Sequence, residues 1–208
     1  MCLQRFGELM PGLTVEEAFS VTRIHSLAGI LSEKVPLVKK APFRMPHQTA
    51  TIEGICGGGT NCRPGEISLA HNGVLFLDEL PEFKRTVLEV MRQPLEDRKI
   101  TVSRSKFSIE YPASFMLVAS MNPCPCGYYN HPTQACTCGL GAVNKYLNKV
   151  SGPLLDRIDL QLEVVPVPFK ELSTLQEGES SETIRKRVIA ARKIQQERFK
   201  DYPNIHCN

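Results

Sequence analysis

The sequence has no apolar run that approaches the ~18–20 residues needed for a membrane-spanning helix. Its N-terminus has no basic-then-apolar signal pattern. The net charge is only +3, so the overall field does not identify a nucleic-acid binder, and any basic surface must be local. These absences predict a cytoplasmic globular protein without a membrane partner, in which eight cysteines favour a metal site over a disulfide framework.

Continuous apolar runs predict strands that are buried on both faces of a parallel sheet. Two such runs lie at 73–77 and 115–121, and a third strand is predicted over 159–165. Segments 100–103 and 107–111 instead alternate apolar and polar residues, which predicts a β-hairpin.

Helix signals occur between these strands. Thr14 and Glu17 form a capping-box pattern that predicts a helix over 15–27. Pro81 fits the first turn of a second helix, which runs to about Arg92 before Pro94 stops it. Helices are also predicted over 142–150 and from Ser180 or Ser181 onward, and loops over 36–46, 54–65 and 124–138.

Two adjacent carboxylates, Asp78 and Glu79, follow the first predicted strand directly. Ligands of open α/β sheets bind at the carboxyl ends of the strands. One carboxylate of such a pair can hold Mg²⁺ through its water shell, and the other can polarise a water that attacks a phosphate. The alternative is a turn at a strand end with two solvated acids.

Two further residues are candidates for the same site. Asn122 ends the second predicted strand, where its amide could hydrogen-bond a phosphate or the attacking water; otherwise it is a turn residue before a proline. Arg157 precedes the third predicted strand. It could stabilise transition-state charge, or it could form a surface salt bridge with Asp156 or Asp159.

Four cysteines form two Cys-x-Cys pairs that are nine residues apart. Each pair can present two thiolates to one ion, and four thiolates are typical of structural Zn²⁺. Cys-x-Cys is tighter than the usual spacing, and the alternative is four free thiols. His131 lies between the pairs and is predicted to be a loop residue. The predicted metal ligands are Cys124, Cys126, Cys136 and Cys138.

The predicted hairpin carries a local basic cluster. Its four cations lie within nine residues that contain no acid: Arg98, Lys99, Arg104 and Lys106. Such a tip can contact nucleic-acid phosphates without reading bases. The alternative is a solvated charged turn.

Three segments resemble the ComM family of Mg-chelatase-like AAA+ ATPases. They are PGEISLAHNGVLFLDELPEFKRTVLEVMRQPLEDRKITVSR from Pro64, MNPCPCGYY from Met121 and GPLLDRID from Gly152. The family is related to the magnesium chelatase ATPase subunit and to MCM helicases. The resemblance implies an α/β fold, an AAA+ αβα three-layer core with a mostly parallel sheet, carrying here a β-hairpin insert and a Cys-rich insertion.

The resemblance also implies a hexameric ring that uses ATP and Mg²⁺ and acts on single-stranded or branched DNA in recombination. By motif, Asp78 and Glu79 correspond to Walker B, Asn122 to sensor 1 and Arg157 to the arginine finger. The basic hairpin would project toward the pore of the ring.

The sequence departs from the family pattern in two ways. It has no Walker A motif, Gly-x-x-x-x-Gly-Lys-Ser/Thr, and no helical lid with a second sensor arginine. We therefore expect an excised piece or a truncated gene product, with a partial core over 1–170 and the start of a lid over 171–208. Without the first strand and the phosphate loop, the 159–165 strand should lie detached, pair abnormally or leave an open edge, and this chain should not bind ATP.

Two other functions remain open at this point. The protein could be the ATPase subunit of a metallochelatase, which acts on a partner that inserts Mg²⁺ into a porphyrin. It could also be a non-catalytic interaction module that zinc stabilises. The basic hairpin and the cysteine insertion favour DNA over the porphyrin pathway.

Overall fold

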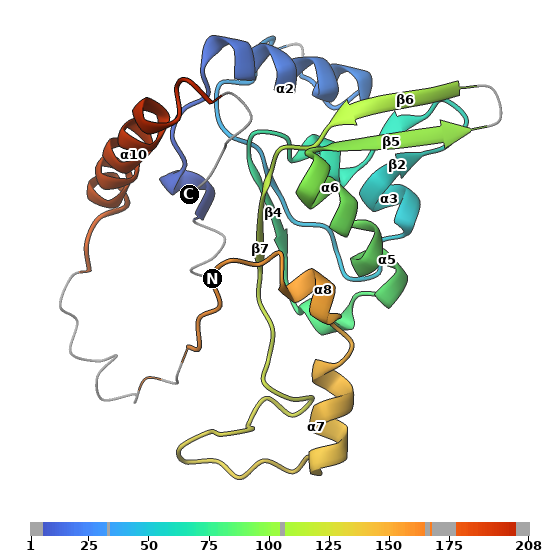
Figure 1. Ribbon diagram of the computed structural model, residues 1–208, viewed down its shortest axis with the longest axis vertical. Helices are drawn as coiled ribbons and strands as arrows, with labels where there is room; N and C mark the ends of the chain where they lie inside the picture. Colours follow the sequence, from blue (N-terminus) through green and yellow to red (C-terminus); the bar gives the residue numbers. More distant parts are fainter. Residues whose placement is uncertain (1–5, 33, 105–106, 165–166, 168–177, 203–208) are drawn as a thin grey trace.

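A three-stranded parallel sheet carries the candidate site (Figure 1). The computed structural model describes residues 6–32, 34–104, 107–164, 167 and 178–202. The middle strand is β4 (Val74–Leu77), with β1 (Phe43–Arg44) on one side and β7 (Met116–Ala119) on the other. β4 and β7 run in parallel register from Val74 opposite Met116 to Leu77 opposite Ala119.

β4 is buried along its whole length, as its apolar sequence predicts. β7 is shorter than the predicted strand, and its side chains are only half-buried, with Met116 45% exposed. The prediction that β7 is fully buried is therefore wrong. β4 has a neighbour on both sides, whereas none of the described residues pairs with the outer edge of β7.

The third predicted strand, 159–165, is not formed in its described part. Residues 158–164 have no regular structure, and three alternate side chains are exposed: Leu160, Leu162 and Val164. A strand is held by backbone hydrogen bonds to a neighbour, and no described residue supplies them here. The segment therefore lies detached, which is one of the three expected outcomes; residue 165 is outside the described residues.

Helices pack around the sheet (Figure 1). In the part of the chain that the structure describes, none of them combines the length and the apolar character of a membrane span. The helices are α1 (Phe6–Leu9), α2 (Val15–Leu27), α3 (Ile52–Cys56), α4 (Glu66–Leu69), η2 (Leu80–Glu82), α5 (Arg85–Val90), α6 (Arg92–Asp97), α7 (Leu140–Leu147), α8 (Gly152–Leu155) and α10 (Ser181–Arg198). α10 lies beside α1, at the opposite end of the chain (Figure 1).

Capping signals locate two helix starts correctly. The Thr14 backbone N–H donates to the Glu17 carboxylate at 2.8 Å, and the Glu17 N–H donates to the Thr14 hydroxyl at 3.2 Å, so the predicted capping box is confirmed. The Ser180 hydroxyl accepts from the Thr183 N–H at 3.3 Å and caps α10.

Three predictions of local structure are wrong in part. Segment 36–46 contains β1, and segment 54–65 contains the end of α3 and a small hairpin, β2 (Gly57–Gly58) with β3 (Arg63–Pro64). The single helix expected up to Arg92 is instead η2 followed by α5. Pro94 does not stop a helix but lies in the first turn of α6, where a missing N–H costs nothing because that group has no intrahelical partner.

The predicted hairpin is confirmed as β5 (Lys99–Arg104) and β6 (Phe107–Pro112). Ile100, Val102 and Tyr111 are buried and join the core that β4, α4 and α5 share. The Tyr111 hydroxyl donates to the Cys62 carbonyl at 2.7 Å, which ties the hairpin to the segment before β3. The base of the hairpin is therefore part of the core, and only its outer end projects from it.

His71 fixes the start of the β4–β7 pair. Its Nδ1 accepts from the Ser114 N–H at 3.1 Å, and the Asn72 N–H donates to the Ser114 carbonyl at 2.6 Å. The imidazole is buried at 8% exposure, and this burial lowers the pKa of His71 to about 4 against a smaller opposing effect of Glu17. His71 is therefore neutral at pH 7 in the folded chain.

This histidine should make stability pH-dependent. Its pKa is lower in the folded chain than in the unfolded one, so the unfolded state binds the proton first, and stability falls as the pH drops from about 6.5 toward 4. We expect a loss of about 2 kcal/mol between pH 7 and pH 5, measured by urea unfolding. His71→Asn keeps an acceptor near the Nδ1 position and should remove most of that slope, whereas an unchanged slope would contradict the role of His71.

Candidate functional site

The carboxylates of Asp78 and Glu79 are exposed at the C-terminal end of β4, the middle strand of the sheet. Glu79 has a left-handed backbone, with φ 53° and ψ 52°, which is uncommon for a residue other than glycine, asparagine or aspartate. The turn directs the chain from β4 into η2. Two adjacent anions thus stand at the strand edge where α/β sheets bind ligands.

Ser120 holds this turn. Its hydroxyl donates to the Asp78 carboxylate, and its carbonyl accepts from the Leu80 N–H at 2.9 Å. The Glu79 N–H donates to the same two side chains: its nitrogen lies 3.1 Å from the Asp78 carboxylate and 3.4 Å from the Ser120 hydroxyl. Sequence reasoning missed Ser120, although parallel pairing of the two runs places the residue after β7 beside the residue after β4.

Asn122 lies two residues beyond Ser120 and is exposed. Burial raises the pKa of Tyr146, a buried residue of α7, and the Asn122 backbone amide acts on the Tyr146 hydroxyl in the direction that lowers that pKa. Within the described residues, its side-chain amide makes no hydrogen bond. The structure therefore brings Asn122 to the same edge of the sheet as the acidic pair and leaves its amide open to solvent.

Arg157 is engaged elsewhere. Its guanidinium forms an ion pair with Glu96 of α6 and donates to the Pro153 carbonyl of α8. The partner is thus neither Asp156 nor Asp159, the two acids considered from the sequence. No hydrogen bond or ion pair joins Arg157 to Asp78 or Glu79 in the part of the chain that is described. Within one chain, Arg157 is not part of the acidic site.

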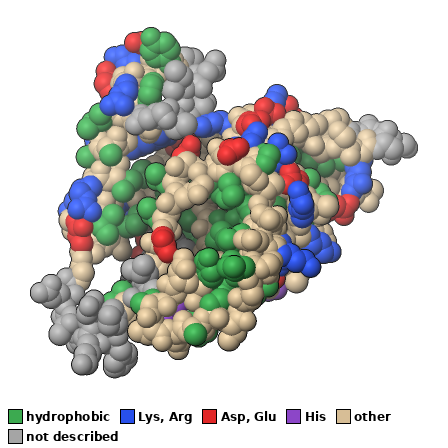
Figure 2. All heavy atoms as spheres, turned by 60° about the horizontal axis from the view of Figure 1, so that its bottom comes forward, with side chains coloured by type: hydrophobic (Ala, Val, Ile, Leu, Met, Phe, Trp, Pro, Cys, Tyr) green, Lys and Arg blue, Asp and Glu red, His purple; other side chains and the backbone are tan. Residues whose placement is uncertain are grey.

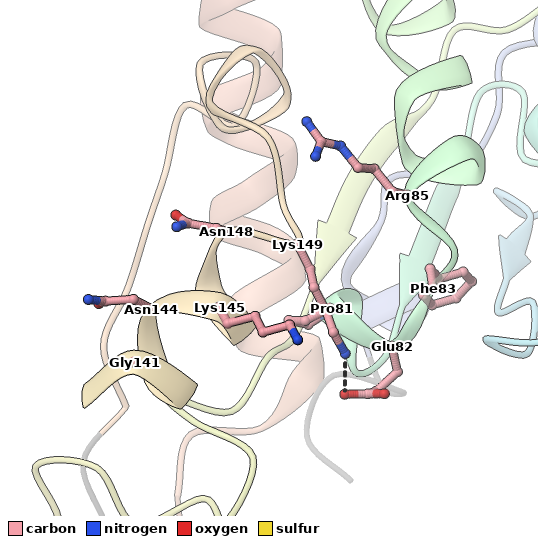
Figure 3. Close-up of a pocket in the computed structure, with 9 residues that line it drawn as sticks. All are labelled: Pro81, Glu82, Phe83, Arg85, Gly141, Asn144, Lys145, Asn148 and Lys149. Carbon is pink, nitrogen blue, oxygen red and sulfur yellow. Dashed lines mark hydrogen bonds and ion pairs between the residues drawn. The ribbon is translucent and has the colours of Figure 1, made fainter. Parts of the chain in front are cut away.

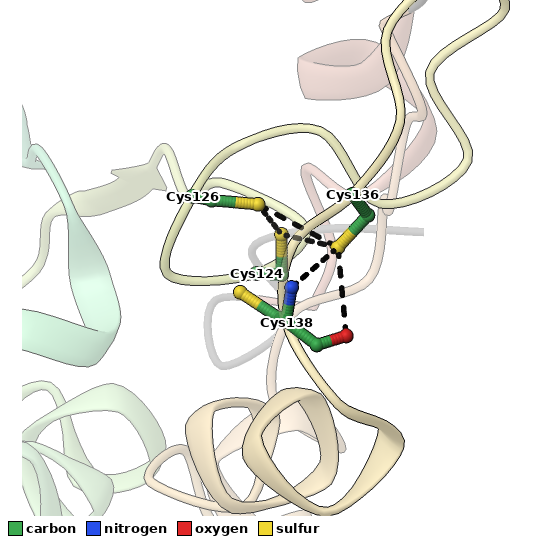
Figure 4. A group of neighbouring side chains, drawn as sticks. All are labelled: Cys124, Cys126, Cys136 and Cys138. Carbon is green, nitrogen blue, oxygen red and sulfur yellow. Dashed lines mark hydrogen bonds between the residues drawn. The ribbon is translucent and has the colours of Figure 1, made fainter.

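The four predicted metal ligands come together (Figure 4). Their sulfur atoms all lie within 4.8 Å of one another. Cys124 is fully buried, and its sulfur is 3.3 Å from that of Cys126 and 3.7 Å from that of Cys136. Four sulfurs around one tetrahedral zinc at about 2.3 Å lie roughly 3.8 Å apart. The thiol spacing therefore suits a metal ion.

Local hydrogen bonds help the cluster to lose its first proton. The Tyr128 backbone amide donates to Cys126 and lowers the pKa of that thiol to about 5. At Cys136 the Cys138 backbone amide acts in the same direction. Burial and the neighbouring thiols of Cys126 and Cys124 outweigh it and raise the pKa of Cys136 to about 12. One thiolate forms readily and disfavours the next, so a cation that neutralises several thiolates is well matched to the cluster.

His131 is a loop residue, as predicted, and its ring is not part of the cysteine cluster. Its Nδ1 accepts from the Gln134 N–H at 3.1 Å and from the Thr133 N–H at 3.3 Å, and its ring meets Tyr128 edge-on. Cys56 and Cys62 are free thiols outside the cluster, and Cys2 and Cys207 lie outside the described residues.

Two of the four cations of the basic hairpin are compensated by acids. Lys99 pairs with Glu110 of β6 at 2.9 Å, and Arg104 pairs with Glu53 of α3. Arg98 donates to the Ser114 hydroxyl at 3.3 Å at the hairpin base. Figure 2 shows acidic and basic side chains interspersed over one face. The acid-free cluster of the sequence is thus neutralised in part by acids from other segments; Lys106 lies outside the described residues.

Comparison with known proteins identifies the family. The profile of the family "Magnesium chelatase, subunit ChlI" matches residues 1–172. This chain belongs to that family. It is also 47% identical over 196 residues to YifB of Escherichia coli and 45% identical over 206 residues to the competence protein ComM of Haemophilus influenzae. These matches cover 94% and 95% of this chain but 38% of each relative, so the chain spans about two fifths of their length.

Two more distant matches were also found. The chloroplastic magnesium-chelatase subunit ChlI of Chlamydomonas reinhardtii is 28% identical over 123 residues, which are 54% of this chain and 28% of that protein. A solved structure of NtrX from Brucella abortus in complex with ADP covers 58% of this chain and 24% of its own, with TM-score 0.40 and 17% identity.

The match to the magnesium chelatase ChlI family and to ComM confirms the resemblance to Mg-chelatase-like proteins that the sequence motifs indicate. The α/β class, the parallel sheet, the hairpin and the Cys-rich insertion are confirmed by the structure. The roles of individual residues remain predictions, as does the division at residue 170, which falls in the undescribed segment 168–177.

The cysteine cluster should bind one divalent metal ion per chain. Titration with Co²⁺ should give the intense thiolate-to-metal absorption of a four-thiolate site, saturating at one equivalent, because the four sulfurs are already close together. Affinity should rise with pH, since the raised pKa of Cys136 makes its proton a competitor of the metal.

Cys136→Ser should lose the tetrathiolate spectrum, and Cys56→Ser, which removes a thiol outside the cluster, should keep it. An identical spectrum in both variants, or no uptake by the unsubstituted chain, would refute the metal site.

Proposed function

We propose that the complete protein is an AAA+ ATPase, and that this chain supplies its water-activating and magnesium-holding carboxylates. The observation that carries the proposal is the exposed pair Asp78–Glu79 at the end of the central strand, fixed by Ser120 and flanked by Asn122. Magnesium prefers hard oxygen ligands and keeps part of its water shell, so a solvent-open carboxylate such as Asp78 suits it.

Each residue then has a distinct role. Asp78 would hold Mg²⁺ through its water shell, and the metal would neutralise charge on the phosphates of ATP. Glu79 accepts a proton from, or orients, the attacking water. The free amide of Asn122 hydrogen-bonds the same water or a phosphate oxygen. The sequence holds no phosphate loop, so the residues that cradle the β- and γ-phosphates are not among these 208.

We also propose that the complete protein assembles into a hexameric ring. In that ring Arg157 would face the nucleotide of the neighbouring subunit and stabilise transition-state charge. Its side chain is 23% exposed, and its guanidinium is held by Glu96 within its own chain. The ion pair with Glu96 would orient Arg157 in the isolated chain. In the ring, the nucleotide of the neighbouring subunit carries more negative charge than Glu96 and would compete for the guanidinium.

DNA is the substrate that we propose for this motor. A relative with 45% identity is named a competence protein, and the hairpin projects from the core, with Arg104 next to its turn and Lys99 exposed at its base. The salt bridges of these two residues are exposed and therefore weak, so phosphates can compete with the acidic partners. The contacts would be to the DNA backbone, without base recognition.

Zinc is the metal that we propose for the cysteine cluster. Four thiolates at tetrahedral spacing suit Zn²⁺, and a site with four protein ligands is structural and not catalytic. Cys124 is only two residues from Asn122, so the metal would hold the chain that follows β7. Such a site would stabilise the irregular segment 120–139, which has no helix or strand of its own.

A metallochelatase ATPase subunit is the second candidate. The observation that favours it is the family profile itself, together with the chloroplastic relative from C. reinhardtii. Both candidates hydrolyse ATP at the same residues, and they differ in the partner that the hydrolysis serves.

The test is ATP hydrolysis by the complete protein with and without single-stranded DNA. Glu79→Gln should lower kcat by several orders of magnitude while ATP still binds, because water activation is lost and the phosphate contacts remain. Glu82→Gln is the matched control, since Glu82 is a neighbouring acid that pairs with Lys149, and it should retain hydrolysis within about threefold.

A fall of less than tenfold in Glu79→Gln would reject Glu79 as the residue that activates water. Stimulation of the unsubstituted enzyme by DNA would support the DNA motor. Hydrolysis that is indifferent to DNA would favour the chelatase subunit.

A further inference from the structure

An open cleft lies beside the acidic pair and is not explained by the proposed function. It is formed between η2 with the start of α5 on one side and the exposed face of α7 on the other, and it encloses about 680 Å³ (Figure 3). None of Asp78, Glu79 and Asn122 lines it, and it shares no residue with the hairpin. The cleft is therefore separate from both sites described above.

The wall supplied by α7 is polar because the helix is amphipathic. Val143 and Tyr146 are buried against the body of the protein. The residues on the cleft side recur at helical spacing and carry only amide and ammonium groups, apart from one glycine: Gly141, Asn144, Lys145, Asn148 and Lys149. A Cβ on Gly141 would meet nothing within 4 Å, so the wall is open at that position.

Three cations reach this cleft from two sides. Arg85 extends from α5, Lys145 extends from α7 toward Pro81 of η2, and Lys149, two residues after the end of α7, extends toward Glu82 of η2 (Figure 3). Lys149 is held in place by Glu82 at 3.3 Å and lies over the Tyr146 ring at 5.3 Å. This pair neutralises Glu82, the only acid that lines the cleft.

The two remaining cations are uncompensated. Among the described residues, neither Arg85 nor Lys145 makes an ion pair. Glu89 attracts Arg85 electrostatically, but its carboxylate is bonded to Arg92 at 3.0 Å. The cleft thus has an excess of two positive charges, and its amide groups come from Asn144 and Asn148.

We infer that this cleft binds phosphate groups. Arg85 on one wall and Lys145 on the other carry their charges at separate points of the cleft (Figure 3), which suits a ligand with several negative charges better than a single carboxylate. No exposed aromatic ring lines the cleft, because Phe83 is buried, so the site contacts phosphates and does not stack bases. The phosphates come from a nucleic-acid backbone or from a free polyphosphate.

The experiment measures binding of two probes to the 208-residue chain: a fluorescein-labelled 20-mer of deoxythymidine by anisotropy, and pyrophosphate by calorimetry. The test variant is Arg85→Gln with Lys145→Gln. The control is Lys39→Gln with Lys40→Gln, which removes the same charge from an exposed loop. Circular dichroism melts should match for all three proteins.

The test variant should weaken binding of at least one probe about tenfold or more, and for the oligonucleotide it should make the salt slope shallower by about 1 to 2. The control should change binding less than about threefold, because screened distant charges contribute little. If the test variant loses oligonucleotide binding, the ligand is a nucleic-acid backbone. If it loses pyrophosphate binding and keeps oligonucleotide binding, the ligand is a free polyphosphate.

Three results would overturn the inference. One is an equal effect of the test and control substitutions. Another is no binding of either probe by the unsubstituted chain. The last is that a 20-residue polyglutamate peptide binds the unsubstituted chain as tightly as the phosphate probes do and loses this binding in the test variant. That result would indicate an acidic protein partner. None of these results bears on hydrolysis, so failure here is distinguishable from failure of the proposed ATPase.

Discussion

The contact between Ser120 and Asp78 is the constraint on which the candidate site depends. It joins the residue that follows β4 to the residue that follows β7, and the Leu80 N–H bonded to the Ser120 carbonyl completes the link. Because of this link, Glu79 takes a left-handed backbone and η2 begins at once. The carboxylate pair is therefore placed by two neighbouring parallel strands and not by β4 alone.

The opposite end of the same strand pair is also fixed. His71 and Asn72 bond the backbone of Ser114, so β4 and β7 cannot slide past one another without breaking contacts at both ends. A one-residue slip would exchange the two faces of β4 and move Asp78 out of line with Ser120. The register that buries β4 is thus the register that aligns Asp78 with Ser120 and brings Asn122 to the same edge.

Much of this was predictable from local chemistry, and the failures have a common cause. The capping box of α2, the β4 strand, the hairpin and the cysteine cluster depend on nearby residues or short spacings, and all are found. The errors at 159–164, Arg104 and Arg157 concern neighbours that the sequence does not reveal. Segment 159–164 has strand character but no partner strand, and Arg104 and Arg157 bond acids 51 and 61 positions away, on α3 and α6.

The most direct test of the account is to remove the Ser120 hydroxyl in the complete protein and to measure ATP hydrolysis across a Mg²⁺ titration. A hydrogen bond to a carboxylate contributes about 1.5–3 kcal/mol, so Ser120→Ala should lower kcat about tenfold or more and raise the Mg²⁺ concentration for half-maximal activity. Ser120→Thr keeps the hydroxyl and should restore both. If Ser120→Ala folds and retains the kcat and the Mg²⁺ dependence of the unsubstituted enzyme, the link does not position the acidic pair.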